Sequence, residues 1–350
     1  MATINARSPY VVTINETGQI ETKLQIFLWN GTGSMPSSPA YTLSKKIPSS
    51  NNPATYYDVS PYVREYIDHN TLQVIDTVFT NTPTSQWCNI GLKLFKKVST
   101  SFTQVGSTQT HFGVDGYGYY EEGYNPALEN YLLTEGTYTY SYNLTGEYGW
   151  LTLYTGSGNS VKYTNLQTGA TYTTGVGTNV WRDIPRVYPS YASAGNLLEI
   201  VNGSGVVLFS STFLPKEECK YEPVQVDFVN KFGAWQREWF FKASFDSLTI
   251  DNTEYNLMPS TYPNYSQYEG QRAVFNANGK KSIRVNTDWV SESYKEVISQ
   301  LMLSENILIN EKQPAKLNTK NTELFKSINT KLINYQLEFE FAYDVINSVV

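Results

Sequence analysis

The sequence predicts a mainly β protein with two β-sandwich domains, Ig-like in character, followed by an α+β domain in which one amphipathic helix packs on a sheet. The first observation is repeated short runs of alternating apolar and polar residues, separated by turn signals. The second is low helix propensity across the first two-thirds of the chain, which is rich in Gly, Thr, Ser, Asn and Tyr. The third is the aromatic content of 28 Tyr, 16 Phe and 7 Trp, which suits sheet faces and subunit interfaces.

Residues 1–126 form the first predicted domain. Leu24, Ile26 and Leu28 alternate with polar neighbours, and residues 87–94 supply a second strand-like run. One short helix is predicted over Ser60–Ile67, because Ser60 can cap it and Pro61 occupies the first helical position. The rest of this domain is expected to be antiparallel β, ending near Pro126.

Residues 127–215 form the second predicted sandwich. Tyr138, Tyr140 and Tyr142 alternate with small polar residues, and turn signals recur about every 8 to 12 residues. A boundary near Pro215 is indicated by charge: residues 1–215 carry 25 charged side chains and residues 216–350 carry 33.

Residues 216–350 form the predicted α+β domain. A strand, a glycine break and a second strand are expected over residues 224–245. Tyr335–Val345 alternates over eleven residues, with an acidic face expected in water and an apolar face expected in the core. Between them, the spacing of Val290, Tyr294 and Leu301 predicts an amphipathic helix over residues 288–303.

Composition argues against several functional classes. The net charge is −6 and no basic cluster exceeds a pair of lysines, so sequence-specific nucleic-acid binding is not expected. Met1–Tyr10 does not resemble a secretory signal, and no apolar run is long enough to span a membrane. We therefore expect a chain that is made in the cytoplasm. Cys88 and Cys219 are far apart and are expected to be reduced and inert.

Catalytic patterns are weak. Glu121 and Glu122, beside Asp115, form a carboxylate cluster, but adjacent residues in an extended segment point to opposite faces and cannot flank one bond unless the backbone turns sharply. His69 and His111 lie near no nucleophile pattern and are expected at the surface or at strand ends. We expect no catalytic residues, no cofactor and no metal.

Two aromatic groups are candidates for contacts with partners. Phe232, Trp235, Trp239 and Phe241 form an aromatic ledge that could be domain core or a subunit interface. The glycine-punctuated tyrosine loop, with Tyr117, Tyr119, Tyr120 and Tyr124, could face outward and stack on sugar rings.

One segment carries a family resemblance. Lys216–Phe245 contains Glu218–Tyr221, which reads E-C-K-Y, and then Phe228–Gly233, which reads F-V-N-K-F-G. This segment resembles virion structural proteins of tailed bacteriophages, including crAss-like and related Bacteroidetes phages. The resemblance extends more weakly to the opening SPYVVTIN, to Asp115–Tyr117 and to Val285–Thr287.

The resemblance implies a structural protein of the virion tail: a ring, connector or hub that forms a homo-oligomer of six or twelve copies around the tail channel. Its other partners would be tail or portal-proximal proteins. The alternative is a receptor- or glycan-binding tail protein. A depolymerase would need a β-helix repeat or a separated acid pair, and neither is visible in the sequence.

Overall fold

The computed structural model describes residues 3–31, 33–48, 52–69, 79–127, 139–143, 151–154, 158–175, 185–187, 193–258, 263–264, 266–268, 270–322 and 332–347. This described chain is mainly β, with several sheets and few helices. The α-helices are α1 (Ser60–Tyr66) and α2 (Lys295–Met302), and the 3-10 turns are η1 (Thr84–Gln86), η2 (Tyr120–Glu122) and η3 (Glu292–Tyr294).

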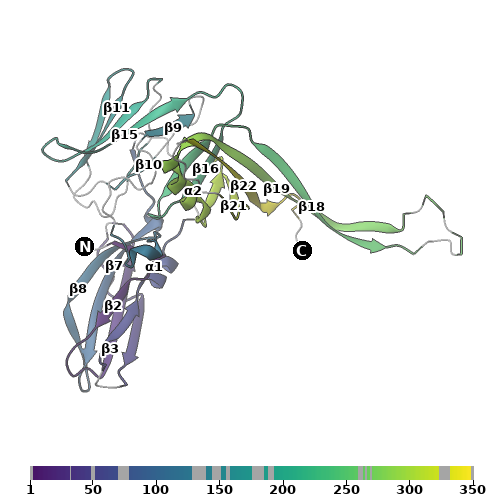
Figure 1. Cartoon of the computed structure of the whole chain (residues 1–350). Coiled ribbons are helices and arrows are strands. Elements are labelled where there is room, and N and C mark those ends of the chain that lie inside the picture. The colour runs from purple at the N-terminus through teal and green to yellow at the C-terminus, as the bar shows by residue number, and fades with distance from the viewer. Residues whose placement is uncertain are drawn as a thin grey trace. The chain divides into compact units, whose positions relative to one another are not determined.

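The chain divides into two compact units (Figure 1). The first contains residues 1–217, 227–238 and 293–304, and the second contains residues 218–226, 239–292 and 305–350. The break after residue 217 is close to the charge boundary expected near Pro215. The division does not separate residues 1–126 from 127–215.

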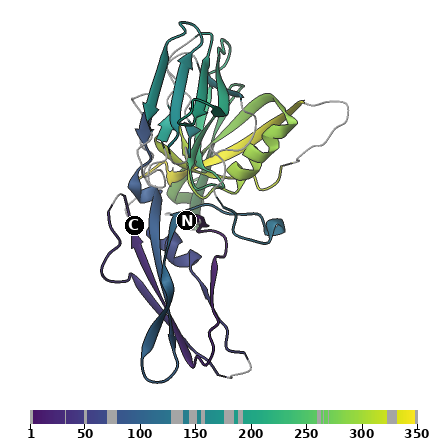
Figure 2. The ribbon, with the colours of Figure 1, turned by 90° about the vertical axis from the view of Figure 1, so that its left-hand side faces the viewer.

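The N-terminal part of the first unit has two facing layers. One is a five-stranded sheet in the order β1 (Thr3–Asn5), β8 (Phe102–Val114), β7 (Trp87–Lys97), β3 (Glu21–Trp29) and β4 (Tyr41–Lys46). The other pairs β2 (Val11–Ile14) with β5 (Thr55–Asp58). Leu24 and Ile26 of β3, Ile14 of β2 and Val63 of α1 share one buried core, which holds the layers together. Figure 2 shows α1 beside these strands.

Two further sheets belong to the first unit. A five-stranded sheet has the order β12 (Thr171–Gly175), β11 (Ser160–Asn165), β14 (Asn196–Val201), β15 (Val207–Lys216) and β9 (Thr139–Asn143). A three-stranded sheet contains β10 (Leu151–Thr152), β13 (Pro185–Val187) and β6 (Phe79–Asn81). The predicted strand that includes Tyr138 begins outside the described residues.

The largest sheet has seven strands, in the order β17 (Trp235–Phe240), β16 (Val224–Val229), β20 (Ile307–Ile309), β21 (Gln313–Leu317), β22 (Leu332–Asp344), β19 (Arg272–Ser291) and β18 (Phe245–Asn256). The alternation expected near the C-terminus is confirmed over most of its length, because Tyr335, Leu337, Phe339 and Phe341 of β22 are buried. Tyr343 and Val345, which were expected to share this face, are exposed.

The predicted helices need two corrections. α1 starts at Ser60, so Ser60 is its first residue and not its cap; the cap residue is Val59, which makes no side-chain cap hydrogen bond, and Asp58 Oδ1 accepts hydrogen bonds from the Ser60 amide and hydroxyl. The second helix was expected from residue 288, yet residues 289–291 form the end of β19 and pair with β22. The sheet ladder uses those backbone groups, so α2 begins only at Lys295. It belongs to the first compact unit rather than to the bulk of the C-terminal sheet.

Candidate functional site

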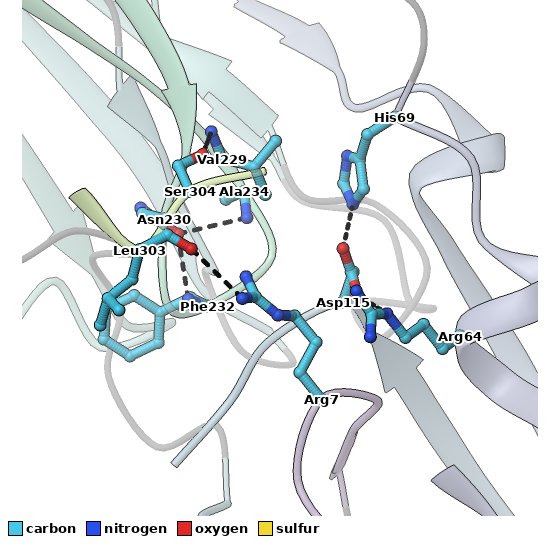
Figure 3. Close-up of polar contacts among 10 residues, drawn as sticks. All are labelled: Arg7, Arg64, His69, Asp115, Val229, Asn230, Phe232, Ala234, Leu303 and Ser304. Carbon is cyan, nitrogen blue, oxygen red and sulfur yellow. Dashed lines mark hydrogen bonds and ion pairs between the residues drawn. The ribbon is translucent and has the colours of Figure 1, made fainter. Parts of the chain in front are cut away.

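The segment with the family resemblance contains β16, β17 and the turn between them, which residues 230–234 form. Asn230 organises this turn: its Oδ1 accepts hydrogen bonds from the amides of Phe232 (3.0 Å) and Ala234 (3.2 Å), as Figure 3 shows. Its Nδ2 donates to Gln236 Oε1 at 3.1 Å. The side-chain oxygen of Asn230 therefore serves as the hydrogen-bond acceptor for two backbone amides of the turn. Gly233 completes the turn with a φ of 73°, which an L side chain rarely adopts.

The Asn230 turn packs directly against the loop that follows β8. The amide of Tyr117 donates to the carbonyl of Lys231 at 2.8 Å. A Cβ atom on Gly233 would lie 2.7 Å from the backbone N and C of Asp115, and a Cβ on Gly116 would lie 2.7 Å from the Lys231 carbonyl oxygen. The two backbones can approach this closely only because both positions are glycine.

The end of α2 flanks the same turn. Gln300 Oε1 accepts from the Lys231 amide at 3.2 Å, and Ser304 Oγ accepts from the Val229 amide at 3.2 Å. Arg7 reaches the carbonyl of Leu303, at 3.2 Å from its Nη2 (Figure 3). Segments near residues 7, 230 and 303 are therefore joined through polar contacts inside one compact unit.

Asp115, which lies in the loop packed against the Asn230 turn, is approached by two titratable side chains. Two side chains approach Asp115 from different elements (Figure 3): Arg64 Nε of α1 lies 4.0 Å from Oδ1, and His69 Nε2 lies 3.8 Å from Oδ2. The His69 side chain is 3% exposed and packs edge-on against Trp235, with the ring centroids 6.5 Å apart. Both His69 and His111 are buried, so a surface position was wrong for either residue; His111 lies near the end of strand β8.

Two buried charged groups lie on β16 and β17: an ion pair between Asp227 and Arg237, and the carboxyl group of Glu238. Arg237 Nε donates to Asp227 Oδ1 at 2.8 Å, and both side chains are at most 3% exposed. Glu238 accepts hydrogen bonds from the Tyr294 hydroxyl and from Gln236 Nε2, both at 2.7 Å. Burial raises the pKa of Glu238 to about 7, and the two hydrogen bonds oppose the shift. Neither group was predicted from the sequence, because the Asp227–Arg237 pair joins two strands and the Glu238–Tyr294 bond joins residues 56 positions apart, so neither leaves a local pattern.

These groups do not form a recognisable catalytic centre. Among the described residues, no group of three or more His, Cys, Asp or Glu side chains could hold a metal ion. Both cysteines are free: Cys219 is exposed, and Cys88 is buried, which raises its pKa to about 12. The protonated Cys88 thiol is a poor nucleophile. The contacts of the Asn230 turn with Tyr117 and Gln300 join separate chain segments, and this structural role is the one that the geometry supports.

The aromatic ledge lies inside the chain. Trp235, Trp239 and Phe241 are 2%, 6% and 3% exposed. Phe232 is partly buried and packs against the core cluster that contains Trp87. The burial of Trp235, Trp239 and Phe241 favours the core interpretation for these three rings, whereas Phe232 keeps part of its surface exposed.

The tyrosine loop contains both packed and exposed rings. Tyr117 and Tyr119 pack edge to face with centroids 5.9 Å apart, and Arg7 lies over the Tyr117 ring. Burial raises the pKa of Tyr117 to about 12. Tyr120 is fully exposed and Tyr124 is 69% exposed, whereas Tyr117 and Tyr119 are partly buried.

Several exposed apolar residues lie on a long hairpin that was not singled out from the sequence. β18 pairs with β19 from Phe245–Arg284 to Asn256–Arg272, whereas β22 pairs with β19 only from Lys280 onward. Residues 251–256 and 272–278 therefore form a two-stranded ribbon, which we call the arm; Figure 1 shows it extending beyond β22. All twelve residues of β18 are exposed.

Apolar side chains lie along the hairpin and its arm. Leu248 and Ile250 of β18 are 54% and 64% exposed, and Val274 and Phe275 of β19 are about half exposed. Tyr255 packs edge-on against Phe275, with the centroids 5.6 Å apart. An isolated two-stranded ribbon is marginally stable in water, and exposed apolar clusters mark contact surfaces. Alternation of Leu248 and Ile250 with polar residues was the available sequence signal.

No protein-family model and no curated protein sequence matches the chain. In the described part of the chain, no helix has the length and apolarity needed to cross a membrane.

Proposed function

We propose that this protein is a non-enzymatic structural component of a bacteriophage virion tail. It would act as a ring, connector or hub that assembles in several copies around the tail channel, with the β18–β19 arm reaching a neighbouring copy. The resemblance of Phe228–Gly233 to phage tail proteins supplies the biological setting. We also propose that the β-sandwich portions are Ig-like and that the mature protein resides in the virion, beside other tail proteins.

The single observation that carries the proposal is the arm. Its strands expose apolar residues that a monomer would keep in water, and it has no third strand among the described residues. Contact with another copy would bury those residues and add the stabilisation that a two-stranded ribbon lacks. A protein whose partner is a copy of itself most often forms a closed, symmetric oligomer.

Replacing residues 251–278 with Asn-Gly tests the role of the arm. Ile250 and Gly279 are directly paired, so a two-residue hairpin turn can join them without changing the register of the remaining strands. We expect the full-length protein to form rings by native mass spectrometry and negative-stain microscopy, and the shortened variant to be a folded monomer. Tyr120→Ala, which alters an exposed ring outside the arm, is the control and should still assemble.

The outcomes are distinct. A full-length protein that stays monomeric up to about 100 µM, a concentration well above that needed by an oligomer of micromolar affinity, would contradict the proposal. Rings formed equally well by the shortened variant would show that the arm is not needed for assembly. Unchanged thermal unfolding of the shortened variant distinguishes loss of assembly from loss of fold.

A glycan-binding tail protein is the second candidate, favoured by the exposed Tyr120 and Tyr124 rings. Binding on a glycan array that Tyr120→Ala abolishes, with the unfolding temperature preserved, would support it. An array without bound glycans, together with ring assembly, would leave only the structural role.

A further inference from the structure

The outer edge of β18 is built to accept another strand. In the described chain β18 ends the seven-stranded sheet, and its twelve exposed residues include no Pro, Lys or Arg. Natural edge strands usually carry such residues, or are short, because unpaired backbone groups recruit other strands. β18 instead presents a long edge with Leu248 and Ile250, a form suited to strand addition.

The charge of β18 selects among possible partners. The strand carries Asp246, Asp251 and Glu254 and no cation. Glu254 lies 3.7 Å from Arg272, whereas Asp246 and Asp251 have no ion pair within the part of the chain that the structure describes. Lys280 and Lys281 belong to β19, which pairs with the inner edge of β18, so β18 itself presents only carboxylates to a strand added at its open edge. Pairing β18 with itself would bring six carboxylates together without a cation on either strand.

One other strand complements this charge. β4 ends the five-stranded sheet and contains Lys45 and Lys46 but no acidic residue. Both lysines are exposed; Lys45 Nζ donates to the carbonyl of Tyr56, and Lys46 has no ion pair among the described residues. Apart from β17, which is buried along its length, no other strand at a sheet end in the described chain contains Lys or Arg.

We propose that β18 of one copy pairs with β4 of a second copy, which extends the sheet of that second copy by one strand. This inference rests on the proposed function as a self-assembling protein. Lysines on β4 repel a second β4, carboxylates on β18 repel a second β18, and only the mixed pair joins opposite charges. The contact joins two different surfaces, so it repeats from copy to copy and can close into a ring. β4 has six residues and spans about 20 Å, which covers half of β18.

Charge reversal in the full-length protein tests this pairing. Lys46→Glu and Asp251→Lys are each expected to raise the protein concentration for half-assembly about tenfold, measured by native mass spectrometry at low salt. The double variant, Lys46→Glu with Asp251→Lys, restores an opposite pair and should return assembly close to that of the unmodified chain. Lys320→Glu is the matched control, because Lys320 is exposed and lies on neither strand.

Disulfide trapping provides a second readout that does not depend on assembly strength. Chains with Lys46→Cys are mixed with chains carrying Asp251→Cys, both in a Cys219→Ser background that removes the exposed native thiol. We expect mixed disulfides between the two chains under mild oxidation and few within either population alone.

Three outcomes would overturn the pairing. Assembly of Lys46→Glu that matches Lys320→Glu would overturn it while leaving the structural role intact. Disulfides formed among Asp251→Cys chains alone, with a dimer as the only oligomer, would assign β18 to a symmetric self-contact. A monomer at every concentration would overturn both this inference and the proposed function.

Discussion

Replacement of Glu238 by Gln should remove a pH-dependent cost from the folded state. Glu238 is 8% exposed, and burial raises its pKa from 4.5 to about 7. Below pH 4.5 the carboxyl group is protonated in both the folded and the unfolded chain, so it adds no difference. As the pH rises towards 7 the unfolded chain loses this proton while the folded chain retains it, which lowers the stability of the fold.

The size of the effect follows from the shift. A difference of about 2.5 pKa units at 1.36 kcal/mol each corresponds to about 3 kcal/mol of stability lost between pH 4.5 and pH 8. Gln has the shape of the protonated acid and can keep hydrogen bonds to Tyr294 and Gln236. Glu238→Gln should therefore be more stable than the unmodified protein by less than about 1 kcal/mol at pH 5 and by up to about 3 kcal/mol at pH 8.

Urea unfolding followed by tryptophan fluorescence measures this at pH 5, 6, 7 and 8. Trp235 and Trp239 lie on the same strand as Glu238 and report on its environment. Glu254→Gln, which removes an exposed carboxylate from β18, is the control for loss of a charge. Parallel pH profiles for Glu238→Gln and the unmodified protein would refute the conclusion that a neutral acid occupies this position.

Two further substitutions test the packing around the Asn230 turn and the buried charges. Gly233→Ala should lower the free energy of unfolding by more than about 2 kcal/mol, because the new Cβ would meet the backbone of Asp115. Gly205→Ala, at a similar φ with no atom within 4 Å, isolates the backbone cost and should be milder when both are compared by thermal unfolding. Arg237→Met should cost about 3–5 kcal/mol by removing the guanidinium from Asp227, and adding Asp227→Leu should recover much of it; equal stability of the single and double variants would contradict this coupling.

The strands were the most predictable part of the fold, because their signal is local. The alternation in β22 identifies its buried face, since successive side chains of a strand point to opposite sides. The residue at which α2 begins was not predictable in the same way. Val290 fits a helical spacing, but its pairing with Ile333 keeps it in a strand, and such a partner lies more than forty residues away.

The candidate site could be predicted only in part. Asn230 and Gly233 were identifiable as a turn because their roles depend on nearby backbone. The contact of that turn with Asp115 depends on residues far apart in the sequence, and no local pattern reports it. The exposure of the β18 side chains could not be predicted either, because the same alternation of apolar and polar residues occurs whether the apolar face packs on a core or lies in water.

The division of the chain into two interleaved units has a consequence for synthesis on the ribosome. The first unit includes residues 227–238 and 293–304, so its last segment emerges only after most of the chain has been translated. Until then the Leu303 carbonyl has yet to meet Arg7, and the Asn230 turn lacks the contact between Gln300 and the Lys231 amide. Completion of the N-terminal unit is thus a late event, coupled to the appearance of the arm, which is made between its two final segments.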